Sequence, residues 1–92
     1  MIRFIWSERK RRQNLAQHGI DFVDAPAVFE GPTYTFEDDR FEYLEQRYVT
    51  LGLLAGIVVS VVHMETPDEI RIVSFRKATI REQEIYFAQI RD

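Results

Sequence analysis

The chain has 92 residues, 46 % of them apolar and 13 % aromatic, a composition that can bury one modest core. It contains no cysteine, which excludes disulfides and thiolate metal sites and fits a reducing compartment. The net charge of −3 is unevenly divided, because residues 1–20 carry +4 and residues 21–45 carry −7. This asymmetry favours one surface for an anion and another for a basic partner, although uneven charge also arises by chance.

No signal peptide is visible at the N-terminus. The longest stretch without a formal charge, Val49 to Met64, has 16 residues and includes two glycines, whereas a spanning helix needs about 20 apolar residues. We therefore expect a soluble, cytoplasmic protein whose residues 1–92 form a single domain.

The first expected elements are a short strand and a helix. Residues 2–6 are mostly β-branched or aromatic, which favours a strand. Ser7 is a suitable N-cap, residues 8–17 have good helix propensity, and Gly19 can close the helix as its C′ residue.

A second short helix is expected to end at Phe29. Either Asp21 or Asp24 can cap it. Pro26 fits only within the first turn of a helix, which favours the later start.

Beyond residue 32 the sequence period changes to two, which predicts strands. Strands are expected over residues 33–36, 45–52, 57–64 and 70–75, joined by turns at 37–42, 53–56 and 66–68. In the second of these strands, Glu45 and Arg47 would share a face with Val49 and Leu51. The third is continuous and β-branched, as expected of a central strand that is buried on both faces.

The last expected element is a helix that ends at about Ile90. Thr79 followed by Glu82 forms a capping box at its start. The whole order predicts an α+β fold: a short N-terminal strand, two N-terminal helices, an antiparallel β-meander of about four strands and a C-terminal helix.

The usual catalytic motifs are absent from the sequence. The acidic pairs Asp38-Asp39 and Asp68-Glu69 stand in expected turns without the ligand spacing of a cation loop, so we expect no metal site and no cofactor. No glycine-rich phosphate loop follows a strand, and no serine lies in a glycine elbow. These absences argue against most of the common enzyme classes.

The two histidines differ in their surroundings. His18 precedes Gly19 at the expected helix C-terminus, which favours the charged imidazolium, so it can serve either as a helix cap or as a proton carrier. His63 lies within the apolar central strand and is better explained as a partly buried structural residue than as a catalyst.

What remains is a set of cations with one carboxylate. Arg76 and Lys77 lie between the last strand and the last helix, where a helix N-terminus is suited to phosphate. An RNA 2′-hydroxyl can attack its own phosphate without a metal if a base, an acid and cations surround it. His18 or Glu45 could move the protons, and Arg47 and Arg76 could stabilise the pentacoordinate charge. The alternative is that these cations only line a solvated sheet edge.

Two further groups of cations are ambiguous. The run Arg9–Arg12 could contact nucleic-acid phosphates, but a helix spreads four consecutive residues around its circumference. Lys10, one turn past Trp6, can face the sheet. Arg71 and Arg76 have opposite parity and share a face only if a bulge intervenes, so Arg71 is a binding candidate rather than a catalyst.

Several motifs along most of the chain together carry a family resemblance. They are Trp6, Lys10 and Asn14; His18-Gly19-Ile20 and Phe22; Ala25 with Val28-Phe29; Glu45-Gln46-Arg47 with Leu51-Gly52; and Arg71 to Thr79 with Glu82 and Tyr86. No single piece is specific, but the order and spacing of the set are. The chain resembles the BrnT family, the toxin half of a type II toxin–antitoxin module.

This resemblance implies a fold similar to RelE-type ribonucleases, RNA cleavage that blocks translation, and no metal cofactor. It implies a BrnA-like antitoxin with a ribbon-helix-helix DNA-binding part as the partner, so that DNA is reached only through the antitoxin. By motif, the histidine of the family falls on His18. Its E-x-R pair falls on Glu45 and Arg47, and its RK pair on Arg76 and Lys77.

The chain also departs from the family pattern. Ser7 replaces the usual Asp after Trp, and either residue can cap a helix. Gln17 stands where Lys commonly precedes HG, which removes a cation, and Phe75 replaces the usual Ala, so that its bulk could narrow a groove or stack on a base. These two changes leave room for weaker or redirected activity.

A rival interpretation is a non-catalytic module that only pairs with an antitoxin, through the acidic residues 21–45. A stand-alone DNA binder is disfavoured, because no expected helix carries a coherent basic face.

Overall fold

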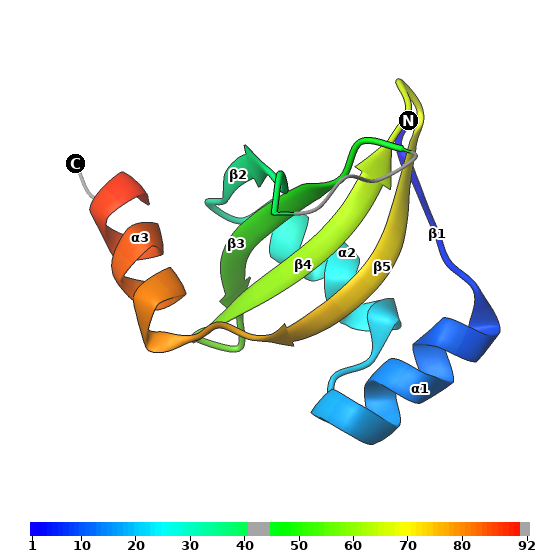
Figure 1. Ribbon diagram of the computed structural model, residues 1–92, viewed down its shortest axis with the longest axis horizontal. Coiled ribbons are helices and arrows are strands. Elements are labelled where there is room, and N and C mark those ends of the chain that lie inside the picture. Colours follow the sequence, from blue (N-terminus) through cyan, green and yellow to red (C-terminus); the bar gives the residue numbers. More distant parts are fainter. Residues whose placement is uncertain (41–44, 91–92) are drawn as a thin grey trace.

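The computed structural model describes residues 1–40 and 45–90, which form a five-stranded mixed sheet packed with helices (Figure 1). In chain order the elements are β1 (Arg3–Ile5), α1 (Glu8–His18), the 3₁₀ turn η1 (Phe22–Asp24), α2 (Ala25–Glu30), β2 (Tyr34–Glu37), β3 (Tyr48–Leu54), β4 (Ile57–Glu65), β5 (Glu69–Lys77) and α3 (Ile80–Ile90). The expected α+β class is confirmed, with helices before the meander and a helix after it. Residues 41 and 42 of the expected turn lie outside the described residues.

The strands lie in the order β1-β5-β4-β3-β2. From β2 to β5 each strand pairs antiparallel with the next, as the meander predicts. β1 instead pairs parallel with β5, with Arg3 opposite Glu69 and Ile5 opposite Arg71. A parallel pair needs a long crossover, which the chain from α1 to β4 provides here. The N-terminal strand therefore covers only the first part of the outer edge of β5.

Each face of the sheet has its own core. On the rear face in Figure 1, α2 and η1 pack on the sheet around Phe22, Ala25, Val28, Val59, Val61, Ile70, Ile72 and Phe75. The opposite, near face carries α3 and a second core of Val49, Leu51, Val58, Val62, Ala78 and Tyr86. β4 supplies residues to both cores, which confirms that it is buried on both faces.

The helix ends follow their capping residues. The Ser7 hydroxyl accepts a hydrogen bond from the Lys10 N–H, and Gly19 closes α1 at a φ of 74° with its N–H donating to the Leu15 carbonyl oxygen. Asp21 caps η1 through the Val23 N–H, and α2 begins later with Pro26 in its first turn, as expected. These local contacts fix the path of the chain from α1 onto the rear face.

The start of β3 was predicted wrongly. The strand begins at Tyr48, not at residue 45, so Glu45 and Arg47 precede it and do not share a strand face. Tyr48 is the last residue that pairs with β2, through Glu37, and the Asp38 N–H then donates to the Arg47 carbonyl oxygen at 2.8 Å. The ladder therefore ends where β2 ends.

The turn between β3 and β4 is shorter than predicted. Only Ala55 and Gly56 form it, with φ values of 51° and 80°, so β3 continues to Leu54. Two central residues with positive φ are typical of the tight hairpin turn that matches the twist of the strands.

Gly52 permits the close approach of α2 to β3. A Cβ atom at this position would lie 2.6 Å from Val28 Cγ1 and 3.2 Å from Thr33 Cγ2. Any side chain here would force Val28, or the helix that carries it, to shift, which gives a packing reason for the Leu51-Gly52 motif.

Candidate functional site

A bulge in β5 brings Arg71 and Arg76 onto one face of the sheet. On β4, Ser60, Val62 and Met64 point to the near face, and they pair with Arg76, Ser74 and Arg71 respectively. The pairing shifts between Val62 and His63, so that β5 has one extra residue there. Both arginines consequently lie on the near face, which no helix crosses over β4 and β5 in Figure 1. The bulge that the parity of the two arginines required is present.

Arg76 is held by a carboxylate at the start of α3. Its Nη1 and Nη2 donate to the two oxygens of Glu82 at 2.8 and 3.0 Å, and Nη1 also donates to the Lys77 carbonyl oxygen at 3.1 Å. Glu82 further accepts from the Thr79 N–H at 2.8 Å, while the Thr79 hydroxyl accepts from the Glu82 N–H. The capping box is therefore confirmed, and the same carboxylate orients the arginine.

Glu82 is ionised in this arrangement. Its partial burial opposes ionisation, but the hydrogen bonds from Arg76 and the Thr79 N–H outweigh that cost and hold the pKa of the Glu82 carboxyl below its usual value. The Arg76 guanidinium thus meets a full negative charge, and a phosphate would have to share it or compete for it.

Arg76 and Lys77 do not converge on one side of the strand-to-helix junction. Arg76 pairs with Ser60 on the near face, whereas Lys77 pairs with Val59, whose side chain belongs to the rear core. Neighbouring residues on a strand point to opposite faces. The exposed Lys77 is therefore separated from Arg76 by the sheet.

Three hollows border β5 in succession. The first, about 280 Å³, is lined by Ile5, Glu45, Met64, Glu65, Thr66, Glu69 and Arg71. The second, about 210 Å³, is lined by Lys10, Gln13, Asn14, Gln17, His18, Val73 and Ser74. The third, about 130 Å³, is lined by Phe36 to Arg40, Val49, Val62, Arg76 and Glu82.

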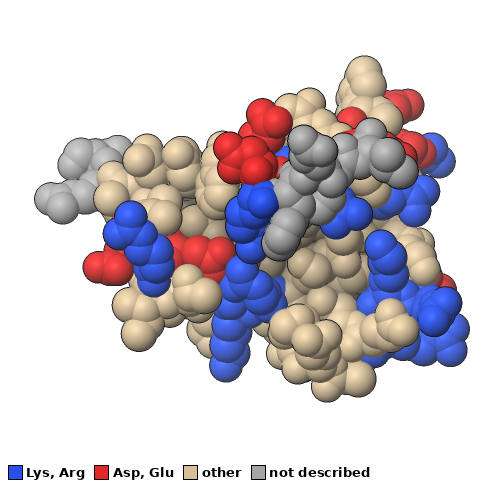
Figure 2. Space-filling view, in the orientation of Figure 1, with Lys and Arg blue, Asp and Glu red and all other residues tan. Residues whose placement is uncertain are grey.

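The expected site residues are thus divided among these hollows. Glu45 lies with Arg71 in the first, Lys10 with His18 in the second, and Arg76 in the third. Each hollow touches a residue of the near face of β5, and Figure 2 shows lysine and arginine side chains on this side of the molecule with carboxylates beside them. The structure places the candidate residues along one strand but not in a single pocket.

The third hollow contains residues that the sequence did not single out. Asp38 is buried, with 4 % of its surface exposed, and accepts from Arg40 Nε at 2.8 Å and Nη2 at 3.0 Å. The backbone bond from the Asp38 N–H to the Arg47 carbonyl oxygen puts the backbone of half-buried Arg47 beside Asp38, although Arg47 does not line this hollow. Nothing in the acidic turn sequence distinguishes Asp38 from Asp39, so its burial had no local signal.

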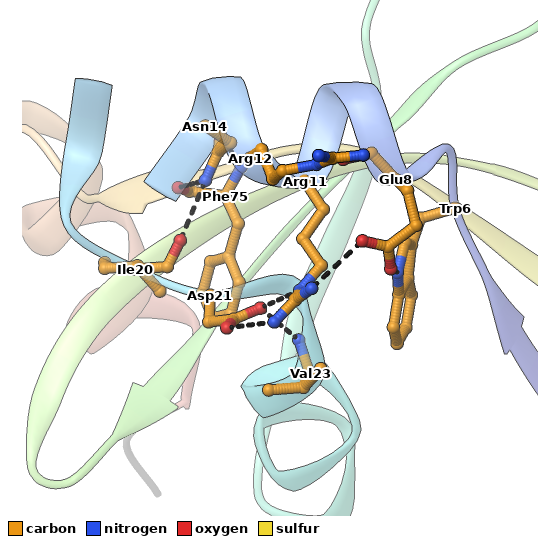
Figure 3. Close-up of polar contacts among 9 residues, drawn as sticks. All are labelled: Trp6, Glu8, Arg11, Arg12, Asn14, Ile20, Asp21, Val23 and Phe75. Carbon is orange, nitrogen blue, oxygen red and sulfur yellow. Dashed lines mark hydrogen bonds and ion pairs between the residues drawn. The ribbon is translucent and has the colours of Figure 1, made fainter. Parts of the chain in front are cut away.

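Asn14 fixes α1 against the uncovered part of the β5 edge (Figure 3). Its Nδ2 donates to the Phe75 carbonyl oxygen at 2.7 Å and to the Ile20 carbonyl oxygen at 3.1 Å, and its Oδ1 accepts from the Phe75 N–H at 3.0 Å. Lys10 and His18 stand four residues before and after Asn14, on the same side of the helix. The side chain of Asn14 therefore holds both next to the second hollow.

Arg11 serves a different purpose from Lys10. Its guanidinium donates to both oxygens of Asp21, at 2.7 and 2.9 Å, and to Glu8 at 3.0 Å, as Figure 3 shows. The hydrogen bonds with Asp21 and Glu8 raise the pKa of Arg11 and lower those of both carboxyls. This cation joins α1 to the turn that follows it, so the run Arg9–Arg12 does not act as one basic patch.

Two other expectations change because the residues are buried. Phe75 is fully buried in the rear core, so it neither narrows a groove nor offers a face for base stacking. His63 is also fully buried rather than partly so, between the rings of Phe29 and Tyr48. Burial lowers the pKa of His63 to about 4, which makes it a neutral core residue.

The described residues contain no group of three or more His, Cys, Asp or Glu side chains arranged to hold a metal ion. Across residues 1–40 and 45–90, no helix is long and apolar enough to cross a membrane.

Fold and site together define a small α+β domain in which arginines, carboxylates and a histidine border β5 in three hollows. A family model described as the ribonuclease toxin BrnT of a type II toxin–antitoxin system matches residues 6–82, and the chain belongs to this family. A comparison with curated proteins finds no match. The protein is thus a ribonuclease toxin of a type II module, which implies a protein antitoxin as its partner.

Proposed function

We propose that the chain is a metal-independent endoribonuclease that binds and cleaves RNA along the near face of β5, and that this cleavage stops translation. A BrnA-like ribbon-helix-helix antitoxin neutralises it. The observation that carries this proposal is the bulge that sets Arg71 and Arg76 on one open face, with Lys10 and His18 beside the hollow between them. Cations spaced along a strand match the repeating phosphates of an RNA backbone.

In the proposed reaction the ribose 2′-oxygen forms a bond to the adjacent phosphorus. The bond from that phosphorus to the 5′-oxygen of the next nucleotide breaks. A base takes the 2′-hydroxyl proton and an acid protonates the leaving 5′-oxygen. The products are a 2′,3′-cyclic phosphate and a 5′-hydroxyl end, and the fixed cations stabilise the pentacoordinate charge without a metal.

Arg76 is the proposed group that stabilises this charge. A guanidinium has five N–H donors, and the three described bonds to Glu82 and Lys77 leave two for a phosphate. Glu82 fixes the plane of the guanidinium in advance, so that little side-chain freedom is lost when the phosphate arrives. Arg47, whose backbone is hydrogen-bonded to Asp38 of the same hollow, is the second candidate for this role.

The proton carrier is His18 or Glu45. His18 borders the second hollow, which touches β5 at Val73 and Ser74. Glu45 borders the first hollow, which touches β5 at Glu69 and Arg71. The position of the scissile phosphate therefore decides which of them acts. Lys10 and Arg71 are the proposed contacts to flanking phosphates, and Lys77 contributes only if the RNA wraps past the end of the strand.

The test is cleavage of an end-labelled RNA by the purified, antitoxin-free chain in excess EDTA, alone and on translating ribosomes. The proposal expects cleavage in EDTA that leaves 2′,3′-cyclic phosphate ends. Cleavage that stops in EDTA and returns with a divalent cation would refute metal independence, and removal of single terminal nucleotides would refute the endonucleolytic mode.

One observation favours a second candidate, the binding-only module: His18, Glu45 and Arg76 line different hollows. For this candidate, a folded chain that binds its antitoxin would leave both free and ribosome-bound RNA intact.

A further inference from the structure

The outer side of α3 carries an apolar stripe. Ile80 is 78 % exposed and Phe87 is 55 % exposed, and their spacing of seven residues puts them on the same side of the helix. The opposite side holds α3 to the sheet through buried Tyr86, whose hydroxyl donates to the Pro32 carbonyl oxygen at 2.9 Å. In Figure 1, α3 stands at the edge of the molecule beyond β2, and the exposure of both side chains places the stripe toward solvent.

One carboxylate lies on the stripe, and others border the side of α3 that faces the sheet. Exposed Glu84 lies between Ile80 and Phe87, four residues after the first and three before the second, and so shares their side of α3. Exposed Glu37 and Asp39 lie at the end of β2, where they line the third hollow together with Glu82 of α3.

Two of the nearby cations are paired with carboxylates. Arg76 is paired with Glu82 and Arg40 with Asp38. Arg81 is the single cation on the described part of α3, and exposed Lys77 precedes the helix, so Glu84 is the carboxylate that belongs to the stripe itself. A partner suited to this side therefore presents apolar side chains for Ile80 and Phe87, with a lysine or arginine placed to meet Glu84.

A second copy of the chain fits this surface poorly. A two-fold contact through the stripe would bring the two Glu84 side chains toward each other, because the same residues meet across such an axis. The partner class that the family implies, a protein antitoxin, has no such constraint.

We propose that the Ile80–Glu84–Phe87 side of α3 is the docking surface for the antitoxin, and that it receives an apolar segment with a lysine or arginine placed to meet Glu84. This inference rests on the proposed neutralisation by an antitoxin. It adds the place of contact and the chemistry of the segment that binds there.

The test uses isothermal titration calorimetry to measure the affinity between this chain and the protein encoded by the neighbouring gene. The variant Ile80→Gln/Phe87→Gln removes the apolar stripe but keeps residues that favour a helix. Leu15→Gln/Val23→Gln is the matched control, because these side chains are 40 % and 50 % exposed on α1 and η1. Glu84→Lys tests the charge separately, and circular dichroism verifies that every variant is folded.

The proposal expects the stripe variant to lose about 30-fold or more in affinity, as for the central contacts of an interface, while the control stays within about threefold. Glu84→Lys should slow association and weaken its dependence on salt. Equal affinity of parent and stripe variant would overturn the proposal, and so would a change from dimer to monomer without loss of antitoxin binding.

RNA cleavage by the stripe variant separates the two claims. Cleavage equal to that of the parent, together with weakened antitoxin binding, supports the docking surface. If the protein encoded by the neighbouring gene does not bind the parent chain at all, both the docking surface and the proposed neutralisation are refuted. If binding occurs but no RNA is cleaved, only the proposed catalysis fails.

Discussion

Asn14 and Phe75, 61 residues apart in the chain, are joined by two hydrogen bonds, 2.7 Å from Asn14 Nδ2 to the carbonyl oxygen and 3.0 Å from the N–H to Asn14 Oδ1. The amide side chain thus makes both bonds that a neighbouring strand would make to this residue. Where β1 stops covering β5, a single residue of α1 continues the edge of the sheet.

Replacing Asn14 with leucine should therefore destabilise the protein. Two buried backbone groups of Phe75 would lose their partners, at a total cost of about 3 kcal/mol in the free energy of unfolding. Urea denaturation measures this, with Gln13→Leu as the control on the exposed neighbour. Equal midpoints for the two variants would show that the Asn14 bonds do not stabilise the fold.

The stability of the protein should depend on pH through His63. Its pKa falls from 6.5 to about 4 on folding, because the ring is buried. Between these values the unfolded chain binds the proton and the folded chain does not, so stability falls as the pH falls, by about 1.4 kcal/mol per pH unit. Its Nε2 lies 2.7 Å from Thr50 Oγ1, whereas Nδ1, 3.3 Å from Glu65 Oε1, makes no hydrogen bond.

The measurement is the free energy of unfolding of the parent and of His63→Phe between pH 4.5 and 6.5. The difference between the two curves should grow toward neutral pH, in favour of the parent. Thr50 keeps its bond to Thr35 in the variant, so no hydroxyl is orphaned. Parallel curves would mean that His63 is protonated in the folded state as readily as in the unfolded one.

Gly52→Ala should destabilise the contact between α2 and β3 by about 2 kcal/mol, because the new Cβ overlaps Val28. Val28→Ala in the same chain should recover part of that loss, since the two sites share one contact. Gly31→Ala is the control, because its Cβ would meet only the Val28 carbonyl oxygen, at 4.0 Å. Thermal melting is measured for the parent, Gly52→Ala, Val28→Ala, their double variant and the Gly31→Ala control. Additive effects of Gly52→Ala and Val28→Ala would contradict a shared contact.

Glu82→Gln should reduce RNA cleavage between about 10- and 100-fold, because Arg76 loses the charged partner that orients it. Glu84→Gln, on the outer side of the same helix, should cleave like the parent. A neutral amide can still accept the Thr79 N–H, so the melting temperature should change little. If Glu82→Gln cleaves faster than the parent, the carboxylate competes with RNA for Arg76 instead of positioning it.

Much of the fold could be predicted because its signals are local. Ser7 and Gly19 bound α1, the Thr79–Glu82 box begins α3, and the β-branched run in β4 marks the central strand. The start of β3 could not be predicted from local signals. It depends on where β2 ends, because β3 has no pairing partner on that side before Tyr48.

The site was less predictable because its geometry depends on distant contacts. Arg71 and Arg76 are an odd number of residues apart, so the sequence indicated that they share a face only if β5 has a bulge. The position of that bulge is known only from the pairing of β5 with β4. The roles of Asn14 and Asp38 rest on partners or burial that adjacent residues do not reveal. The sequence therefore named most of the candidate residues, whereas their separation into three hollows needed the folded chain.

The most direct test of the central claim compares two neighbours on β5. Arg76 lies on the proposed RNA face and Lys77 on the opposite face, so Arg76→Ala and Lys77→Ala remove one positive charge each from adjacent positions. Single-turnover cleavage of a labelled RNA in EDTA should fall at least about 100-fold for Arg76→Ala and stay within about threefold of the parent for Lys77→Ala. Equal losses in the two variants, or a larger loss for Lys77→Ala, would contradict an active surface on the near face.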